Sequence, residues 1–423
     1  MNLIDISKKT ILVGVTGSIA IYKACELVRL FVKSGANVKV VMTPSAQKFI
    51  TPLTFEVITR NRVLTSQSED WSSNLNHIDY AQNCDAFVIA PATANTINKL
   101  SKGIADNILL ESALAHHKNL IIAPSANTQM LNNHYTEGSL KMLAVNDVVI
   151  VKPQEKLLAC GTQGNGALAE PIEIYYQTLK EILKDDFWSN RKVVVTGGGT
   201  REAIDSVRFI GNHSSGKMAN ALATALYLKG ADVCMVTTKP SNNLPQEVYT
   251  LSVEDAQEML EYTIDCIRVA KKGVMSKASL NNPNAIGMIQ KTPYLFMAAA
   301  VADYTPKFPQ EGKLKKDSIG NEWSIELKQT PDILKTIDKS GIITVGFKAE
   351  KDEKTALENA KKALNTKGID AIALNILKEQ NNFGSDNNEI IFITKDKEQK
   401  IELNSKINVA FSLINLAKEL DSE

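Results

Sequence analysis

The feature that most constrains this chain is a strand–glycine–helix–strand pattern that occurs once in each half. In the first half, the β-branched run TILVGV (10–15) leads through Gly17 into a helix-like segment and then the strand ANVKVVMT (36–43). In the second half, VVVTGGG (193–199) leads through a polar loop to the helix KMANALATALYLKG (217–230) and the strand ADVCMVTT (231–238). The segments SGANVKVVMT and KGADVCMVTT are visibly alike, which suggests two similar units in tandem.

Each half continues with further apolar runs that alternate with helical segments. Strands joined by helices form parallel sheets, because a parallel connection needs a crossover of helix length. We therefore predict an α/β protein with two tandem Rossmann-like domains and mostly parallel, doubly wound sheets. The predicted boundary lies near Asn190, which gives domains of 1–189 and 190–423. The additional predicted strands lie within 86–96, 120–130, 145–153, 294–304, 343–350 and 369–377.

The composition is that of a globular protein, and it narrows the range of partners. Of the 423 residues, 44% are hydrophobic and 22% are charged, and the net charge of +1 favours neither nucleic acid nor an anionic membrane. No apolar run approaches the roughly 18 residues of a membrane span, and the N-terminus lacks the apolar core of a signal peptide. The five cysteines are scattered without a C-x-x-C pair, which favours a reducing cytoplasm over disulfides or zinc.

Polar residues follow several strands of the first half, where the carboxyl ends of parallel strands meet at one edge of a sheet. Gly17 and Ser18 stand between the first strand and its helix, so the hydroxyl and the helix N–H groups could receive a phosphate. An ordinary tight turn explains these two residues equally well. Thr93–Thr96 and Asn127 are expected at the same edge.

The glycine-rich segment LLACGTQGNGALAEP (157–171) is predicted to be a mobile loop, because its glycines fit neither a helix nor a central strand. It carries Cys160, whereas the other four cysteines lie in apolar helix or strand context. Cys160 is therefore a candidate acid or redox group. A purely structural role for it remains an alternative.

The segment Gly211–Lys217 has the G-x-x-x-x-G-K spacing of a P-loop, but the next residue is Met218. A thioether does not replace the hydroxyl with which a P-loop holds Mg²⁺, and this segment does not directly follow its strand. A P-loop nucleoside kinase is therefore disfavoured. Contact with a phosphate or nucleotide in another geometry is favoured.

Three further features carry candidate chemistry. His77 opens a polar helix start and could work near its ordinary pKa of about 6.5. Asp303 ends an apolar strand, which is costly unless its carboxylate faces a cleft. The lysines of GKLKK (312–316) form either a solvated loop or a clamp for a triphosphate. No pair of histidines has metal-ligand spacing, so we predict no zinc site.

Long strings in both halves resemble one family, the bifunctional phosphopantothenoylcysteine decarboxylase/phosphopantothenate–cysteine ligases of coenzyme A synthesis. The resemblance extends over nearly the whole chain, in the family's domain order. In the first half the matching strings are VGVTGSIAIYK, the His77 segment, APATANT, PSANTQM and ACG. In the second half they are TGGGTREAID-x-VR, NHSSGKM, AAAVADY, KLKK, TPDIL, GFKAE and FGSDNNE.

For the N-terminal domain the resemblance implies an FMN-dependent decarboxylase. The flavin would oxidise the cysteinyl thiol of the substrate to a thioaldehyde, carbon dioxide would leave, and reduced flavin with a proton would return the enethiol to 4′-phosphopantetheine. The resemblance implies that His77 is the catalytic histidine, that Asn127 binds the substrate carboxylate and that Cys160 donates the proton. The residues implied to line the FMN are Gly17, Ser18, Thr43, Thr93, Ala94, Asn95, Thr96 and Ser125.

For the C-terminal domain the resemblance implies a CTP-dependent ligase that works with Mg²⁺. The carboxylate of 4′-phosphopantothenate would attack the α-phosphate of CTP, and the amine of cysteine would then displace CMP from the acyl-cytidylate. Asn212 is implied to contact this acyl-cytidylate. The residues implied to bind substrate or nucleotide are Gly199, Asp205, Asn212, Ala299, Asp303, Lys313, Pro331, Asp332, Ile333, Phe347, Lys361, Lys362 and Lys367.

This chain departs from the family's usual pattern at four places. The usual P-A-M-N is Pro124–Asn127 here, and the usual Ala-Asn-Asp after the last core strand is Leu374–Ile376. The lysine helix differs in length by about a residue, so Lys361 and Lys362 are not separated. The flap, which commonly reads G-R-M, is Gly166-Ala167-Leu168 here and has therefore lost an arginine.

The resemblance also implies partners. The expected partners are the small molecules 4′-phosphopantothenate, cysteine and CTP, with no nucleic acid and no membrane. Decarboxylase domains are expected to form trimers and ligase domains to form dimers. An alternative is a flavoprotein that retains one activity or a regulatory role, but the joint presence of His77, Asn127 and Cys160 argues against it. The preference for CTP over ATP is not set by these residues.

Overall fold

The computed structural model describes residues 3–158, 161–276, 279–280, 287–314, 322–382 and 384–421. Contacts within the chain divide it into two compact units. The first comprises Leu3–Leu183 and Ser276–Gly287, and the second comprises Lys184–Met275 and Met288–Glu423. The division falls a few residues before the predicted boundary at Asn190, because the segment that follows Leu183 packs with the second unit.

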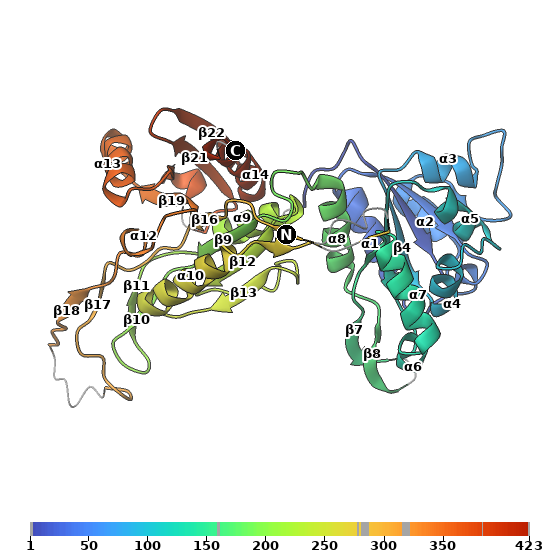
Figure 1. Ribbon diagram of the computed structural model, residues 1–423, viewed down its shortest axis with the longest axis horizontal. Helices are drawn as coiled ribbons and strands as arrows, with labels where there is room; N and C mark the ends of the chain where they lie inside the picture. Colours follow the sequence, from blue (N-terminus) through green and yellow to red (C-terminus); the bar gives the residue numbers. More distant parts are fainter. Residues whose placement is uncertain are drawn as a thin grey trace. The chain divides into compact units, whose positions relative to one another are not determined.

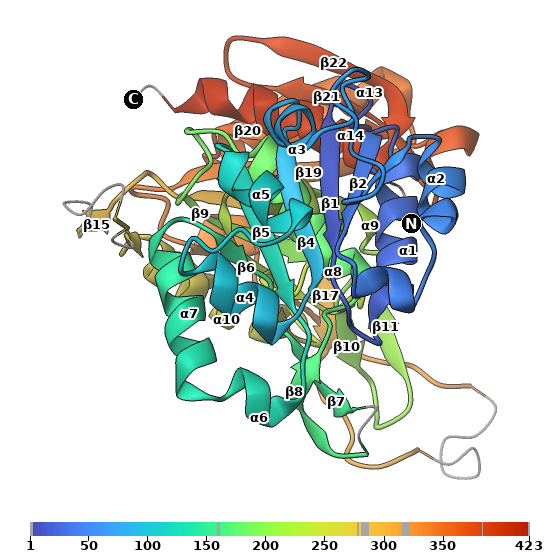
Figure 2. The ribbon, with the colours of Figure 1, turned by 90° about the vertical axis from the view of Figure 1, so that its right-hand side faces the viewer.

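The first unit is built around a six-stranded sheet in the order β3-β2-β1-β4-β5-β6, in which every pair of neighbours is parallel. Figure 2 shows β2, β1, β4 and β5 side by side. Every residue of β4 is buried, as expected for a central strand that is covered on both faces. The strands are β1 (Thr10–Val15), β2 (Asn37–Met42), β3 (Val63–Leu64), β4 (Ala86–Ala92), β5 (Asn119–Pro124) and β6 (Val149–Ile150).

Helices cover both faces of this sheet. α1 packs with α8 against one face, and α3 packs with α5 on the other (Figure 1). Several of these helices begin at an Asn or Thr whose side chain accepts a backbone N–H, which fixes where the helix starts. The helices are α1 (Ile21–Lys33), α2 (Pro52–Thr59), α3 (His77–Gln82), α4 (Ala94–Leu100), α5 (Ile108–Ala115), α6 (Thr128–Leu131), α7 (His134–Val145) and α8 (Pro171–Leu183).

The second unit repeats this topology and extends it. Its eight-stranded sheet has the order β13-β12-β9-β16-β19-β20-β21-β22. The first six strands are parallel, and β21 and β22 add an antiparallel edge. The strands are β9 (Lys192–Gly197), β12 (Asp232–Thr237), β13 (Tyr249–Ser252), β16 (Tyr294–Met297), β19 (Ile343–Glu350), β20 (Ala371–Ile376), β21 (Asn387–Ile393) and β22 (Glu398–Ser405).

This sheet is also covered on both faces. α9 and α14 pack together on one face, while α10 and α13 contact the other. Short two-stranded pieces project from the loops: β10 (Arg201–Ala203) with β11 (Phe209–Gly211), β14 (Val274–Met275) with β15 (Met288–Ile289), and β17 (Tyr304–Pro306) with β18 (Leu327–Gln329). The helices are α9 (Lys217–Leu228), α10 (Ala256–Ala270), α12 (Ile333–Thr336), α13 (Glu353–Lys367) and α14 (Lys406–Ala417).

The fold class predicted from the sequence is confirmed. The similar segments 34–43 and 229–238 contain β2 and β12, each of which is the second strand of its sheet. In both units the second and fourth strands in chain order flank the first. The similarity in sequence between the two halves therefore corresponds to a similarity in the strand order of their sheets.

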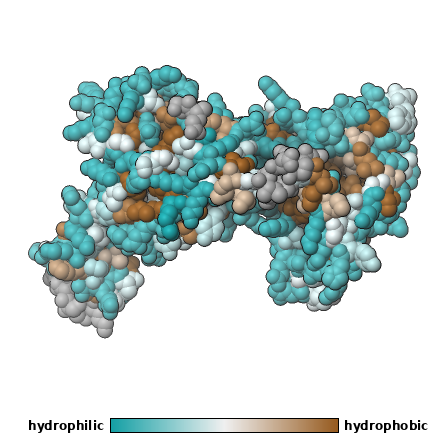
Figure 3. All heavy atoms as spheres, in the orientation of Figure 1, coloured by the Kyte–Doolittle hydropathy of each residue, from teal (hydrophilic) through white to brown (hydrophobic). Residues whose placement is uncertain are grey.

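The visible surface is mostly hydrophilic, with apolar patches (Figure 3). Within the described part of the chain, no helix combines the length and the apolar character that a membrane span requires.

A buried ion pair fastens the two ends of the second unit together. Arg191, which precedes β9, donates to Asp421 at 2.5 Å, and both side chains are only 5% exposed. The guanidinium also donates to the carbonyl of Thr292 at 2.7 Å and lies 4.0 Å from the centre of the Phe187 ring. Because a buried charge is tolerated only when it is paired and hydrogen-bonded, these contacts explain why Arg191 is compatible with an aromatic interior.

We expect Arg191→Ala to lower the stability of the second unit by about 3–5 kcal/mol, because it leaves Asp421 buried without its cation. The measurement is hydrogen exchange of β9 and β16 in the full-length chain, read as the free energy of opening. Lys192→Ala is the matched control, since Lys192 pairs with the half-exposed Asp232 at 2.6 Å and should change stability by less than about 1 kcal/mol. Equal effects of the two variants would contradict a special role for the buried pair.

Candidate functional sites

A cavity of about 1010 Å³ in the first unit lies at the carboxyl edge of its parallel sheet. β1 pairs with β2 on one side and with β4 on the other, so the chain reverses its direction of winding between β1 and β4. Loops diverge from such a switch point and leave a crevice where ligands bind. The cavity is lined by the segments that follow four strands, namely Thr16–Ser18, Thr43–Ser45, Thr93–Thr96 and Ser125–Asn127.

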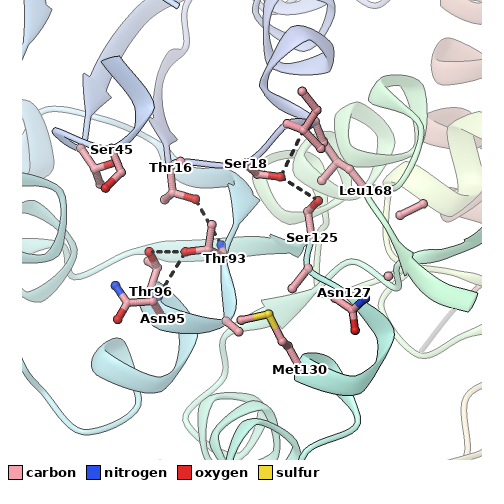
Figure 4. Close-up of a pocket in the computed structure, with 18 of the residues that line it drawn as sticks. Thr16, Ser18, Ser45, Thr93, Asn95, Thr96, Ser125, Asn127, Met130 and Leu168 are labelled. Atoms are coloured by element: carbon pink, nitrogen blue, oxygen red, sulfur yellow. Dashed lines mark hydrogen bonds between the residues drawn. The ribbon is translucent and has the colours of Figure 1, made fainter. Parts of the chain in front are cut away.

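Hydroxyl groups hold this edge together (Figure 4). The buried Thr16 donates to the carbonyl of Pro91 at 2.6 Å and accepts the N–H of Thr93 at 3.1 Å. The side chain of Thr93 in turn accepts the N–H of Thr96, so the expected turn at 93–96 is the cap and first turn of α4. Ser18 and Ser125, from the first and last of these loops, lie 3.2 Å apart. The cavity edge therefore presents several hydroxyls that could bind a phosphate or a sugar.

Gly17 is required by the close approach of two loops. A Cβ at this position would lie 2.6 Å from the Cβ of Ser45 and 3.0 Å from its carbonyl carbon. The glycine thus lets the loop after β1 meet the loop after β2, and it supports the tight-turn interpretation without excluding a ligand. Ser18 accepts the N–H of Ala20, the residue before α1.

A hairpin closes one side of the cavity. It consists of β7 (Gln154–Leu157) and β8 (Gln163–Ala167), so part of the predicted glycine-rich loop is in fact paired strand. The carbonyl of Gly166 accepts the N–H of Ala126 at 3.2 Å, and a Cβ at Gly166 would lie 2.0 Å from the carbonyl oxygen of Ala126. The hairpin thus packs directly on the loop that carries Asn127. Cys160 lies outside the described residues.

His77 is not brought to this cavity within the unit. It is the first residue of α3, and its Nδ1 lies 2.8 Å from Glu69 Oε1. Its ring meets that of Trp71 edge to face at 5.5 Å. The carboxylate of Glu69 can fix the tautomer and orientation of the imidazole, an arrangement common for histidines that transfer protons.

In the second unit the glycines after β9 allow the loop to pass close to other backbone. Gly198 has φ of +81°, and a Cβ there would lie 2.2 Å from the Thr238 hydroxyl. A Cβ at Gly199 would lie 2.4 Å from the carbonyl oxygen of Asn212. Ala300 donates its N–H to the carbonyl of Gly198 at 2.8 Å, which ties the end of β9 to the segment after β16.

A cavity of about 620 Å³ lies beside this junction and collects many of the expected nucleotide residues. Its described lining includes Ala299, Asp303, Pro331, Asp332, Ile333, Phe347 and Lys367. These residues come from the segments after β16 and β18, from β19, from α12 and from the end of α13. Lys367 pairs with Asp332 at 3.2 Å. The cavity therefore combines an aromatic face with carboxylates and three lysines, Lys335, Lys348 and Lys367.

A smaller cavity of about 170 Å³ lies at the N-terminus of α9. It is lined by His213–Ala219 and shares Ala299, Phe347 and Lys348 with the larger cavity. β10 and β11 stand between β9 and this segment, so the loop is not arranged as a P-loop. Its position at a helix N-terminus suits an anion.

Six expected residues are absent from the described lining of these two cavities: Gly199, Asp205, Asn212, Lys313, Lys361 and Lys362. Lys361 pairs with Glu398 at 2.5 Å instead. Asn212 donates to the carbonyl of Val301 at 2.8 Å, which places it beside the larger cavity. Asp205 is buried, and hydrogen bonds from Arg208 and from the backbone of Val207 hold the pKa of its carboxyl well below its usual range. It organises the loop between β10 and β11.

Several lining residues were missed by the sequence analysis. Lys348, next to Phe347, borders both second-unit cavities, and Tyr304 and Thr330 line the larger one. In the first unit, Lys23 and Lys156 line the cavity. Lys348 could have been found from its place at the carboxyl end of a buried strand, whereas Lys156 carries no local signal. Among the described residues, no group of three or more His, Cys, Asp or Glu side chains is placed to hold a metal ion.

The geometry defines a two-unit α/β protein with a ligand cavity at the carboxyl edge of each parallel sheet. The family model Flavoprotein matches residues 2–183, and the model DNA/pantothenate metabolism flavoprotein C-terminal domain matches residues 188–280 and 274–420. The chain is 36% identical over 417 residues to the coenzyme A biosynthesis bifunctional protein CoaBC of Bacillus subtilis (strain 168), covering 97% of this chain and 96% of the relative.

Two further relatives extend this picture. The protein of the same name from Haemophilus influenzae (strain ATCC 51907 / DSM 11121 / KW20 / Rd) is 35% identical over 417 residues, covering 96% of each chain. A cysteine/cysteine sulfinic acid decarboxylase from an unknown prokaryotic organism is 35% identical over 382 residues, covering 86% of this chain and 98% of the relative. The chain belongs to the family of coenzyme A biosynthesis bifunctional proteins. The family expected from the sequence motifs is confirmed.

We expect Gly17→Ala to lower the stability of the first unit by about 1–3 kcal/mol, because the added methyl overlaps Ser45 and pushes the two loops apart. Gly138→Ala in α7 is the control, since a Cβ there meets nothing within 4 Å and alanine favours a helix. The measurement is urea unfolding of both variants, with a crystal structure of the first. An unchanged loop with unchanged stability would contradict the packing argument.

Proposed function

We propose that this chain converts 4′-phosphopantothenate to 4′-phosphopantetheine in two steps of coenzyme A synthesis. The second unit would join 4′-phosphopantothenate to cysteine with CTP, and the first would decarboxylate the product with FMN. The observation that supports the proposal is that each unit has its own cavity at its sheet edge, lined in part by residues of the strings that resemble the family. We assign the decarboxylase to residues 1–189 and the ligase to residues 190–423.

The first-unit cavity fits FMN in size and chemistry. Pockets for ligands of this kind span roughly 300–1,000 Å³. The hydroxyls of Ser18, Thr43, Thr96 and Ser125 can donate to phosphate and ribityl oxygens, and the apolar side chain of Met130 offers a surface for a ring. FMN, when bound, supplies the two-electron oxidation of the substrate thiol that makes the carboxylate a leaving group.

The protein's own residues would position the substrate and move its protons. Asn127 would bind the carboxylate that is lost, and Cys160 would donate the final proton. His77 is held by Glu69 away from the cavity of its own unit. We therefore propose that decarboxylase units assemble as trimers, so that His77 of one copy serves the cavity of the next.

The second unit would activate a carboxylate and then form an amide. The carboxylate oxygen of 4′-phosphopantothenate attacks the α-phosphorus of CTP and pyrophosphate leaves. The amine of cysteine then attacks the acyl carbon, CMP leaves, and the amine loses a proton. Asp303, Phe347 and the 331–333 segment would bind the nucleotide, and Asn212 would contact the acyl-cytidylate. Lys367 would face its phosphates, with Lys313 and one of Lys361 or Lys362 as further contacts.

We propose that Mg²⁺ arrives with CTP rather than occupying a site of its own. The phosphates of CTP supply oxygen ligands of the kind that Mg²⁺ prefers, and Asp303 and Asp332 lie in the wall of the same cavity. The metal would neutralise charge on the α-phosphate and on leaving pyrophosphate.

Exposed apolar side chains on the projecting pieces of the second unit support dimeric ligase contacts. Phe209 is 53% exposed on β11, and Tyr304 is 48% exposed on β17. β10 and β17 lie together, so these side chains belong to one region. We propose that two ligase units bury this region against each other. We place the protein in the cytoplasm on the basis of its scattered cysteines, four of which are free thiols in the described part of the chain.

The test supplies purified protein with 4′-phosphopantothenate, cysteine and each nucleoside triphosphate in turn, and follows amide formation and carbon dioxide release. We expect a yellow protein that releases one CMP and one pyrophosphate per amide and one carbon dioxide per 4′-phosphopantetheine. A colourless protein that does not take up FMN would refute the decarboxylase half. A protein that performs one of the two steps would support the single-activity alternative.

We expect Asn212→Asp to abolish amide formation, because a carboxylate beside the acyl-cytidylate repels its phosphate and cannot donate a hydrogen bond. Decarboxylation of supplied phosphopantothenoylcysteine should remain at the wild-type rate, and product analysis by mass spectrometry measures both steps. Asn220→Asp on α9 is a control for the added charge within the same unit. Simultaneous loss of both activities would refute two independent sites.

A further inference from the structure

The charged side chains in the described wall of the first-unit cavity fall into two groups. Lys99 and Asp106 pair with each other at 2.5 Å and cancel in charge. The second group consists of Lys23, Lys156 and Glu170. It contains two cations and one carboxylate and therefore carries an excess positive charge.

Glu170 is shared between the two lysines of this group. Its Oε1 accepts Lys23 Nζ at 3.2 Å and also accepts Lys156 Nζ. Partial burial opposes ionisation, but the hydrogen bonds from Lys156 and Lys23 outweigh it and lower the pKa of Glu170. The two ammonium groups thus share one carboxylate oxygen. Each ammonium group can therefore donate a further hydrogen bond to an anion.

The two lysines differ in how firmly they are held. Lys23 projects from α1, its side chain is 13% exposed, and it also donates to the carbonyl of Leu168 at 3.3 Å. Lys156 lies on β7 of the hairpin and its side chain is 49% exposed. Its rotation toward a ligand would leave Glu170 paired with Lys23. Lys156 is therefore the cation that can turn into the cavity at little electrostatic cost.

The family commonly has an arginine at the position of Ala167 on β8, and Lys156, the partner of Gly164, lies on the neighbouring strand β7. Residue 167 is alanine here, and Gln154 and Ala167 are partners in the pairing of β7 with β8. Ala167 and Lys156 both line the cavity. β8 thus lacks the positive charge of the family's usual arginine, and β7 beside it carries the positive charge of Lys156.

We propose that Lys156 binds the phosphate of the decarboxylase substrate and sets the preference of the first unit for a phosphorylated substrate. This inference rests on the function proposed above. A phosphate monoester carries about −1.5 to −2 charges at pH 7 and attracts an ammonium group whose carboxylate partner is shared. Asn127, on the loop after β5, remains for the carboxylate of the same substrate. Lys23 is a positioning residue that keeps Glu170 ionised and paired.

The experiment compares kcat/KM for phosphopantothenoylcysteine and for its dephosphorylated form, pantothenoylcysteine, with FMN saturating. In Lys156→Gln the ratio of the two values should fall by about 10- to 100-fold, through KM of the phosphorylated substrate, while the dephosphorylated substrate is unaffected. Lys156→Arg should retain most of the preference. Lys152→Gln, an exposed residue of the same segment outside the described cavity wall, should behave as the wild type.

Other outcomes would overturn the inference. An equal loss of kcat/KM for both substrates would show that Lys156 stabilises the hairpin and does not recognise the phosphate. Weaker FMN binding with an unchanged substrate ratio would assign Lys156 to the phosphate of the cofactor. If Lys156→Gln keeps the wild-type kcat/KM for both substrates, Lys156 has no role in substrate recognition. Wild-type protein that decarboxylates neither substrate would refute the proposed function itself, and flavin content and thermal unfolding verify that each variant is folded.

Discussion

In each unit, a buried threonine at the end of the first strand accepts a backbone N–H from the segment after the neighbouring strand, at the point where the two strands diverge. In the first unit Thr16 accepts the N–H of Thr93. In the second, Thr196 accepts the N–H of Ala299 at 3.2 Å. Both side chains are at most 1% exposed. Where neighbouring parallel strands diverge, ladder hydrogen bonds end, and the hydroxyl satisfies a backbone group that would otherwise be buried without a partner. This bond borders the cavity in each unit, whose lining includes Thr16 and Thr93 in the first unit and Ala299 in the second.

Much of the fold could be predicted from the sequence because its signals are local. The β-branched runs, the glycines after the first strands and the similarity of 34–43 to 229–238 each reflect neighbours along the chain, and they were sufficient to predict the tandem α/β arrangement. The residues of the larger second-unit cavity were also predictable in part, because Asp303 follows the buried strand β16, Phe347 lies in the second half of β19, and parallel strands end at one edge.

Other features could not be predicted, since they depend on contacts between distant segments. The pairing of Lys361 with Glu398 and the position of His77 beside Glu69 are set by packing, not by residue type. β8 and Leu157 of β7 fall within the segment 157–171, which was predicted as a mobile loop because glycine disfavours strands. Here Gly164 and Gly166 are needed for the hairpin to approach Thr128 and Ala126 without a clash.

The ion pair of Arg191 with Asp421 has a consequence for how the two units could have come together. It joins Arg191, just before β9, to Asp421, which follows α14, so both ends of the second unit lie close together. A domain whose ends lie close together can accept a chain connection at that one place without interruption of its interior. The second unit meets this condition at its two ends, where Lys418 and Asp185 form a further ion pair at 2.8 Å, although the segment Ser276–Gly287 within its span belongs to the first unit.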